Sequence, residues 1–137
     1  MRVLAVDPGS KRVGLAISDS TGTIAQPMTT IPAEPRETLA ARLATVAREH
    51  EAVRIVVGLP RRMDGSLGPE AKAARELAGE VRAASKLPVE LVDERLTTAA
   101  AEKSLLAGGM RRKDRRANID RVAAAILLQT HLDRRHE

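Results

Sequence analysis

The sequence predicts an α/β fold in which one mixed sheet is covered by helices on both faces. Three strand-like segments come first, joined by connections too short for helices. Apolar strands then alternate with segments of helical periodicity. Early antiparallel strands followed by strand–helix units are typical of a mixed sheet with helices on both sides. The expected order is βββαβαβαα, in a single domain that spans residues 1–137.

The first three segments have the composition of strands. Residues 2–7 are nearly all apolar, as in a central strand that is covered on both faces. Residues 12–19 and 22–31 follow after short turns, which predicts a hairpin or a meander. Pro27 cannot donate a ladder hydrogen bond, so the third strand is expected to be short or to lie at an edge of the sheet.

The rest of the chain predicts helices and strands in alternation. A helix is expected between residues 35 and 51, a strand over 53–60, and a second helix that begins at Pro69. A strand over 87–94, a helix from Thr97 or Thr98 to about residue 108, and a final helix follow. The predicted apolar faces are Leu39, Leu43, Val46 and Ala47 in the first helix, Ala73, Leu77, Val81 and Ala84 in the second, and Ile119, Val122, Ala123, Ile126 and Leu127 in the last.

Composition excludes several functional classes. The chain has no Cys, which rules out disulfides, thiolate zinc sites and cysteine nucleophiles. It has no Phe, Tyr or Trp, so single-strand binding by base stacking is not expected. A net charge of +5 favours anionic partners, although the excess of Arg over Lys also fits a GC-rich genome. No signal-peptide pattern or membrane-length apolar run is present, so we expect a cytoplasmic protein with no membrane partner.

Carboxylates stand where two of the predicted strands end. Asp7 ends the first strand, and Asp93 and Glu94 end the last one. Ligand sites of open α/β sheets lie beyond the carboxyl ends of the strands, so these acids are expected to converge if both strands are parallel and central. Asp120 lies in the opening turn of the final helix, which could bring it to the same rim.

Three carboxylates at one rim repel one another unless cations neutralise them. Two divalent ions about 3.5 to 4 Å apart would do so and would drive in-line phosphodiester hydrolysis. A ligand set of oxygens without histidine favours Mg²⁺ or Mn²⁺ over zinc. The pattern therefore predicts a magnesium or manganese site.

Each acid also has an ordinary structural explanation. Asp7 before Pro8 and Gly9 could be a turn former that bonds its own backbone. Asp93 or Glu94 could pair with Arg95 at the surface. Asp120 could do no more than complement the helix dipole. An acid at the end of so apolar a strand fits the turn explanation least well.

Four blocks of the sequence together resemble one known family. "VDPGSKRVGLAISD", "IVVGLPRRMDGSLG", "VDERLTT" and "IDRVAAAILLQTHL" are similar, in order and spacing, to the YqgF/RuvX family. That family comprises Holliday junction resolvases, also described as pre-16S rRNA nucleases. The resemblance spans nearly the whole chain and implies an RNase H-like fold. It implies Asp7, Glu94 and Asp120 as the catalytic metal ligands, and it selects Glu94 over Asp93. Asp19 and Asp93 remain as candidates for a fourth acid.

Basic residues cluster next to the predicted strand ends, which suggests a cationic rim around the carboxylates. A charge run is often just a solvated loop, but one of these clusters leads directly into the helix that bears Asp120. The candidate nucleic-acid-binding residues are Lys11, Arg12, Arg61, Arg62, Arg95, Arg111, Arg112, Lys113, Arg115 and Arg116. Contacts to phosphates position a strand without reading its bases. Structured RNA or branched DNA is therefore the expected partner, and cutting two symmetric strands of a junction would favour a homodimer.

Two other functions fit part of the pattern. Asp-x-Gly followed by a small hydroxyl residue also opens the phosphate-binding hairpin of the actin and sugar kinase group, which would make this an ATP-binding domain. That group clamps its nucleotide between two such domains, and 137 residues supply one. The other alternative is a non-catalytic RNA-binding or ribosome-assembly module whose carboxylates have no catalytic role.

Overall fold

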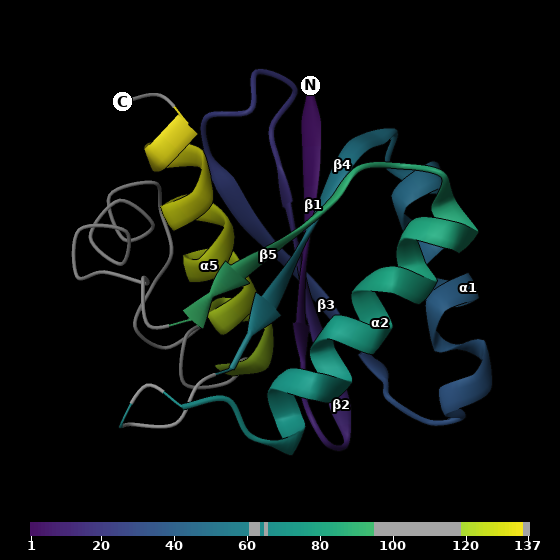
Figure 1. Ribbon diagram of the computed structural model, residues 1–137. Coiled ribbons are helices and arrows are strands. Elements are labelled where there is room, and N and C mark those ends of the chain that lie inside the picture. Colours follow the sequence, from purple (N-terminus) through teal and green to yellow (C-terminus); the bar gives the residue numbers. More distant parts are fainter. Residues whose placement is uncertain (61–63, 65, 95–118, 136–137) are drawn as a thin grey trace.

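The computed structural model describes residues 1–60, 64, 66–94 and 119–135, and the side chains of the last range from residue 123 onward. Five strands form one sheet in the order β3-β2-β1-β4-β5 (Figure 1). They are β1 (Arg2–Pro8), β2 (Arg12–Ser18), β3 (Ala25–Pro32), β4 (Ala52–Leu59) and β5 (Val89–Asp93). The helices are α1 (Arg36–Glu49), α2 (Pro69–Ser85) and α5 (Ile119–Arg135). The helix predicted from Thr97 or Thr98 lies outside the described residues.

The sheet is mixed, as predicted. β1 pairs with β2 antiparallel, and β2 pairs with β3 antiparallel, which confirms the meander. β1 pairs with β4 parallel, and β4 pairs with β5 parallel. The β3 strand, which contains Pro27, lies at one edge of the sheet, where a residue without an N–H is tolerated. The carboxyl ends of β1, β4 and β5 therefore lie side by side at one rim.

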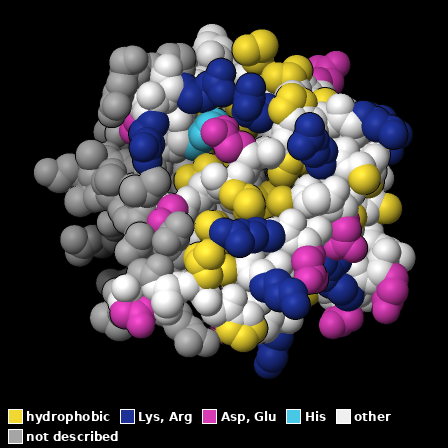
Figure 2. Space-filling model, viewed as in Figure 1, with side chains coloured by type: hydrophobic (Ala, Val, Ile, Leu, Met, Phe, Trp, Pro, Cys, Tyr) yellow, Lys and Arg dark blue, Asp and Glu magenta, His cyan; other side chains and the backbone are white. Residues whose placement is uncertain are grey.

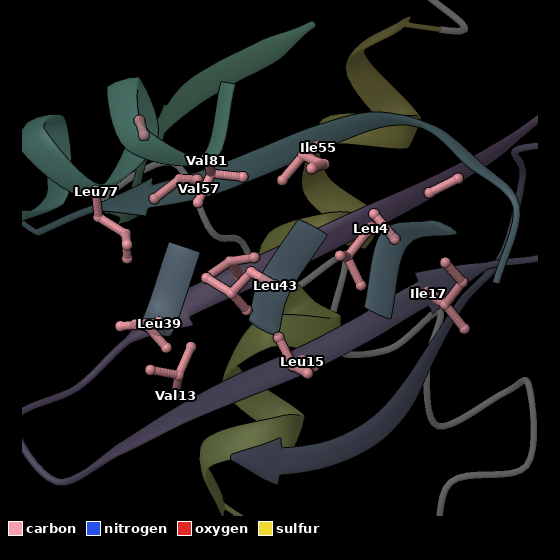
Figure 3. Close-up of a cluster of buried hydrophobic side chains, with 14 of the residues drawn as sticks. Leu4, Val13, Leu15, Ile17, Leu39, Leu43, Ile55, Val57, Leu77 and Val81 are labelled. Carbon is pink, nitrogen blue, oxygen red and sulfur yellow. The ribbon is translucent and has the colours of Figure 1, made fainter. Parts of the chain in front are cut away.

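Helices cover both faces of the sheet, with α1 and α2 on one side and α5 on the other (Figure 1). On the α1 and α2 face, Leu4 of β1 and Ile55 and Val57 of β4 pack against Leu43 and its neighbours (Figure 3). Val6 of β1 belongs to the same cluster. On the α5 face, Val3 and Ala5 of β1 and Val56 of β4 pack against the helix. Successive strand residues point to opposite faces, so each strand contributes to both cores.

The predicted apolar faces of two helices need correction. In α2, Ala73 and Ala84 are exposed, and the buried residues are Ala71, Ala74, Leu77, Ala78 and Val81. In α5, Ala123 and Ile126 are only half-buried, and the buried apolar residues are Ala124, Ala125, Leu127, Leu128 and Leu132. Both helices carry alanines on several sides. Apolar periodicity alone therefore does not determine which of several adjacent helix faces is buried.

Gln129 attaches α5 to the turn between β2 and β3. Its Oε1 accepts a hydrogen bond from the Ala25 N–H at 2.9 Å, and its Nε2 donates to the Thr23 carbonyl at 3.0 Å and to Asp133 Oδ1 at 2.9 Å. The side chain is buried. These bonds fix the far end of α5 to the sheet.

Replacing Gln129 with leucine is expected to lower the free energy of unfolding by about 1–3 kcal/mol, because the side-chain volume is kept while buried polar partners lose their bonds. Urea unfolding measures the loss. Gln26→Leu is the matched control, since Gln26 is exposed on β3 and the same change there is expected to alter stability by about 0.5 kcal/mol or less. Equal stability of the two variants would contradict this role of Gln129.

His131 is a buried titratable group of α5. Its Nε2 has no hydrogen-bond partner in the described part of the chain, and its Nδ1 lies 3.7 Å from Glu90 Oε2. Burial lowers the pKa of His131; Glu90 opposes this shift, whereas Arg54, Arg134 and Arg135 add to it. The folded state therefore favours the neutral imidazole.

This pKa shift predicts a loss of stability on acidification. A histidine whose folded pKa is depressed contributes its full stability above the unfolded value of about 6.5 and loses it as the pH falls through the folded pKa. The urea midpoint is expected to drop more between pH 7.5 and 5.5 in the wild type than in His131→Gln, which cannot titrate. Parallel drops in the two proteins would show that His131 does not drive the change.

Candidate functional site

Two of the predicted acids meet at the rim formed by the parallel strands. On β1, Asp7 follows Val3 and Ala5 in the alternation that faces α5. Glu94 directly follows β5, two residues after Val92, which also packs on the α5 side. Between them, on β4, the residue in the α5-facing register is Gly58, two positions after Val56. The pleat directs the Asp7 carboxylate to the α5 side of the sheet. The Glu94 carboxylate reaches the same side from the residue after β5, so the two face each other across a strand that has no side chain at that point.

The two carboxylates lie close together. An ideal Cβ placed on Gly58 would lie 2.8 Å from Glu94 Oε1 and 3.4 Å from Asp7 Oδ1. Both oxygens are thus within 3.4 Å of one point above the middle strand. A cavity of about 230 Å³ opens there, lined by Asp7, Glu94, Ala123, Ile126 and Leu127. It has a pair of carboxylates on one wall and the apolar face of α5 on the other.

Asp120 is on the helix that closes this cavity. It lies in the first turn of α5, three residues before Ala123, which lines the cavity. The side chain of Asp120 is not among those described. Among the side chains that the structure describes, which include those of Asp7 and Glu94, no group of three His, Cys, Asp or Glu residues could hold a metal.

The chain matches a family model over nearly its whole length. The model is described as "RuvX: Holliday junction resolvase" and covers residues 1–134. The chain belongs to the RuvX family. This confirms the resemblance in the sequence, and it makes the chain one of a family of nucleases.

Individual relatives agree with this family. A protein from Moorella thermoacetica is 47% identical over 137 residues, 98% of this chain and 96% of that one. A protein from Roseiflexus sp. is 45% identical over 132 residues, 96% of this chain and 94% of that one. Each carries the name "Putative pre-16S rRNA nuclease".

Solved structures of two resolvases have the same fold. Thermus thermophilus RuvC in complex with a Holliday junction substrate superposes with a TM-score of 0.70 at 16% identity, covering 99% of this chain and 96% of RuvC. The fowlpox virus Holliday junction resolvase gives a TM-score of 0.60 at 16% identity, covering 98% and 99%. At such identities the likeness concerns the fold, and it confirms the predicted RNase H-like architecture.

Asp19 is one of the two candidates for a fourth acid in this RuvX-family protein. It lies far from the cavity. β1 pairs with β2 so that Asp7 is opposite Gly14, whereas Asp19 follows the other end of β2. There its Oδ1 accepts hydrogen bonds from the N–H groups of Ile24, at 3.0 Å, and Thr23, at 2.8 Å. These bonds, with one from the Thr21 hydroxyl, hold the pKa of Asp19 well below its usual range. Asp19 is a turn residue.

Asp93, the other candidate for a fourth acid, is the last residue of β5 and lies between Val92 and Glu94 in the chain. Val92 packs on the α5 face, so the strand pleat directs Asp93 to the opposite face of the sheet. It is thereby separated from the cavity that holds Glu94. Of these two neighbouring acids, Glu94 lines the cavity and Asp93 does not.

Two of the predicted basic residues are described. Both are exposed: Lys11 lies in the turn that follows β1, and Arg12 is the first residue of β2. The remaining predicted contacts, Arg61, Arg62, Arg95, Arg111, Arg112, Lys113, Arg115 and Arg116, lie outside the described residues. Figure 2 shows Lys and Arg side chains scattered among acidic ones on the face in view, with no single basic patch among the coloured atoms. None of the helices in the described ranges is long and apolar enough to cross a membrane.

Proposed function

We propose that this chain is a metal-dependent nuclease, which hydrolyses phosphodiester bonds in a structured nucleic acid. One observation carries the proposal: Asp7 and Glu94, which are remote in sequence, converge on one cavity at the carboxyl rim of three parallel strands. Ligand sites of open α/β sheets lie at such rims. Membership of a nuclease family supports the same reaction class.

The donor set fits a hard divalent cation. Carboxylate oxygens are the donors of Mg²⁺ and Mn²⁺ sites, and two of them line a cavity of about 230 Å³. Asp7, Glu94 and Asp120 are the residues that would hold the ions, with Asp120 contributed by the first turn of α5. When bound, divalent ions activate the attacking water and stabilise the departing 3′-oxygen.

The side chains of this chain have distinct parts in that reaction. Asp7 and Glu94 supply the negative charge that attracts cations to the rim, and the strands that carry them fix their positions. Leu127, Ile126 and Ala123 form an apolar wall that keeps bulk water away from the carboxylates and strengthens electrostatic interactions in the cavity.

Basic residues around the rim would hold the phosphates of the substrate. Lys11 in the β1–β2 turn and Arg12 at the start of β2 are exposed near the end of β1 that carries Asp7. Arg61, Arg62, Arg95 and the run from Arg111 to Arg116 are the further proposed contacts, from the sequence alone. Each phosphate that is neutralised on a duplex adds about −0.9 to the slope of log affinity against log salt. Recognition by backbone and shape suits structured precursor rRNA or a four-way DNA junction, and a homodimer would suit the junction.

A cleavage panel tests the proposal. A four-way junction, duplex DNA, single-stranded DNA and a structured RNA are incubated with the purified protein in Mg²⁺, in Mn²⁺ and in chelator. The expected result is cleavage of the RNA or of the junction that requires a divalent ion, and the preferred substrate identifies the physiological class. Cleavage that persists in chelator, or no cleavage of any substrate in either metal, would overturn it.

A further inference from the structure

Gly58 occupies the one α5-facing position between the two strand ends that carry carboxylates. β4 is the middle strand of the β5-β4-β1 group, and its register pairs Gly58 with Val92 of β5, two residues before Glu94. Val56, two residues earlier, is fully buried against α5. A strand of such composition would ordinarily continue with another β-branched residue.

The glycine at this position is not explained by backbone conformation. Its φ lies outside the left-handed region, so an L-residue could adopt the same backbone. Glycine within a strand also weakens the strand, because it loses more conformational freedom on folding and packs no side chain. The reason for a glycine must therefore lie in the space that a side chain would fill.

That space is the floor of the cavity between Asp7 and Glu94. A Cβ on Gly58 would lie 2.8 Å from Glu94 Oε1, closer than real Cβ contacts, and 3.1 Å from Leu127 Cδ2. Its 3.4 Å separation from Asp7 Oδ1 is an ordinary van der Waals contact. A methyl group would therefore displace the Glu94 carboxylate first and the Leu127 side chain second, while Asp7 stays in place.

We propose that Gly58 is a positioning residue for the cation site, and that its missing side chain lets Glu94 approach Asp7 closely enough for both to bind one divalent ion. This inference rests on the proposed function, because it assigns the cavity to a cation. Substitutions that disturb the surroundings of metal ligands typically weaken metal affinity by about 10–100-fold. We expect a loss of that size for Gly58→Ala.

Gly79→Ala is the matched control. Gly79 is an exposed residue of α2, and a Cβ there would meet nothing within 4 Å. The two variants make the same chemical change, one at the cavity and one in open space. Mn²⁺ titration of the full chain by calorimetry, and the electron paramagnetic resonance spectrum of bound Mn²⁺, report the site without any turnover. Urea unfolding in chelator reports the fold.

The expected result is weaker Mn²⁺ binding and an altered Mn²⁺ spectrum in Gly58→Ala only, with a urea midpoint close to that of the wild type. Equal Mn²⁺ affinity in Gly58→Ala and wild type would overturn the role of Gly58 and leave the nuclease proposal standing. A wild type that binds no Mn²⁺ would overturn the cation site itself, and both proposals with it. If Gly58→Ala is unfolded in chelator, the steric account is wrong, because it confines the displacement to side-chain ends.

Discussion

Asp7→Asn is expected to reduce the rate of cleavage by at least about a hundredfold while nucleic-acid binding is retained. Asparagine keeps the shape of aspartate but lacks its charge, and it binds a hard divalent cation far less well. Removing a single preorganised electrostatic group from an active site commonly lowers turnover by about 10²–10³-fold. Single-turnover cleavage in Mg²⁺ or Mn²⁺ measures the rate, and binding to labelled substrate in chelator measures affinity.

The same variant separates the enzyme from a binding module. Ligand that binds only the folded state stabilises it, by about 2.7 kcal/mol at a concentration one hundred times the dissociation constant. Mn²⁺ is therefore expected to raise the unfolding midpoint of the wild type and not that of Asp7→Asn. Asp19→Asn is the matched control, because Asp19 lies at the opposite end of β2. A module without catalysis would show no cleavage in wild type and no effect of either substitution on binding.

Much of this site could be predicted from local sequence. An apolar strand that ends in Asp7 is unusual enough to mark the residue, since burial of an unsatisfied carboxylate is costly. The antiparallel meander and the edge position of Pro27 followed from turn length and from the missing N–H of proline. These features depend on a few neighbouring residues, and they could therefore be predicted from the sequence.

Other features required the order of the strands. Asp7 and Glu94 converge because β4 lies between β1 and β5 and runs parallel to both. No local pattern fixes that order. The role that we propose for Gly58 also depends on strand order: in sequence Gly58 only precedes the end of an apolar strand, and its closeness to Glu94 exists once three strands are in register. The corresponding signal is a glycine on a strand that lies between two strands ending in acidic residues, at a position that faces the same side of the sheet as the acids.

Which face of an alanine-rich helix is buried also could not be predicted from the sequence. Alanine is buried at Ala74 and exposed at Ala73, although both are apolar and adjacent. In an alanine-rich helix the larger residues decide which face packs, and Leu77 and Val81 alone leave several neighbouring faces nearly equivalent. In α5, Leu127 is buried as predicted, whereas Ala123 and Ile126 are half-buried beside the cavity.

Leu127→Ala is expected to lower both stability and cleavage, whereas Leu128→Ala is expected to lower stability alone. Both leucines are buried in the same core on the α5 face, so each truncation should lower the free energy of unfolding by about 2–5 kcal/mol. Of the two leucines, Leu127 lines the carboxylate cavity and Leu128 does not. Its loss removes part of the wall beside Glu94 and lets water and the carboxylate move.

Displacements of about 1 Å at a reacting centre can slow turnover about a hundredfold, so Leu127→Ala is expected to cleave roughly ten- to a hundredfold more slowly per folded molecule. Leu128→Ala should cleave within about twofold of wild type under conditions where urea unfolding shows both variants folded. The comparison holds stability loss nearly constant and changes only the contact with the cavity. Equal rates in the two variants would mean that the wall formed by α5 does not position the carboxylates, and that the strands alone hold them.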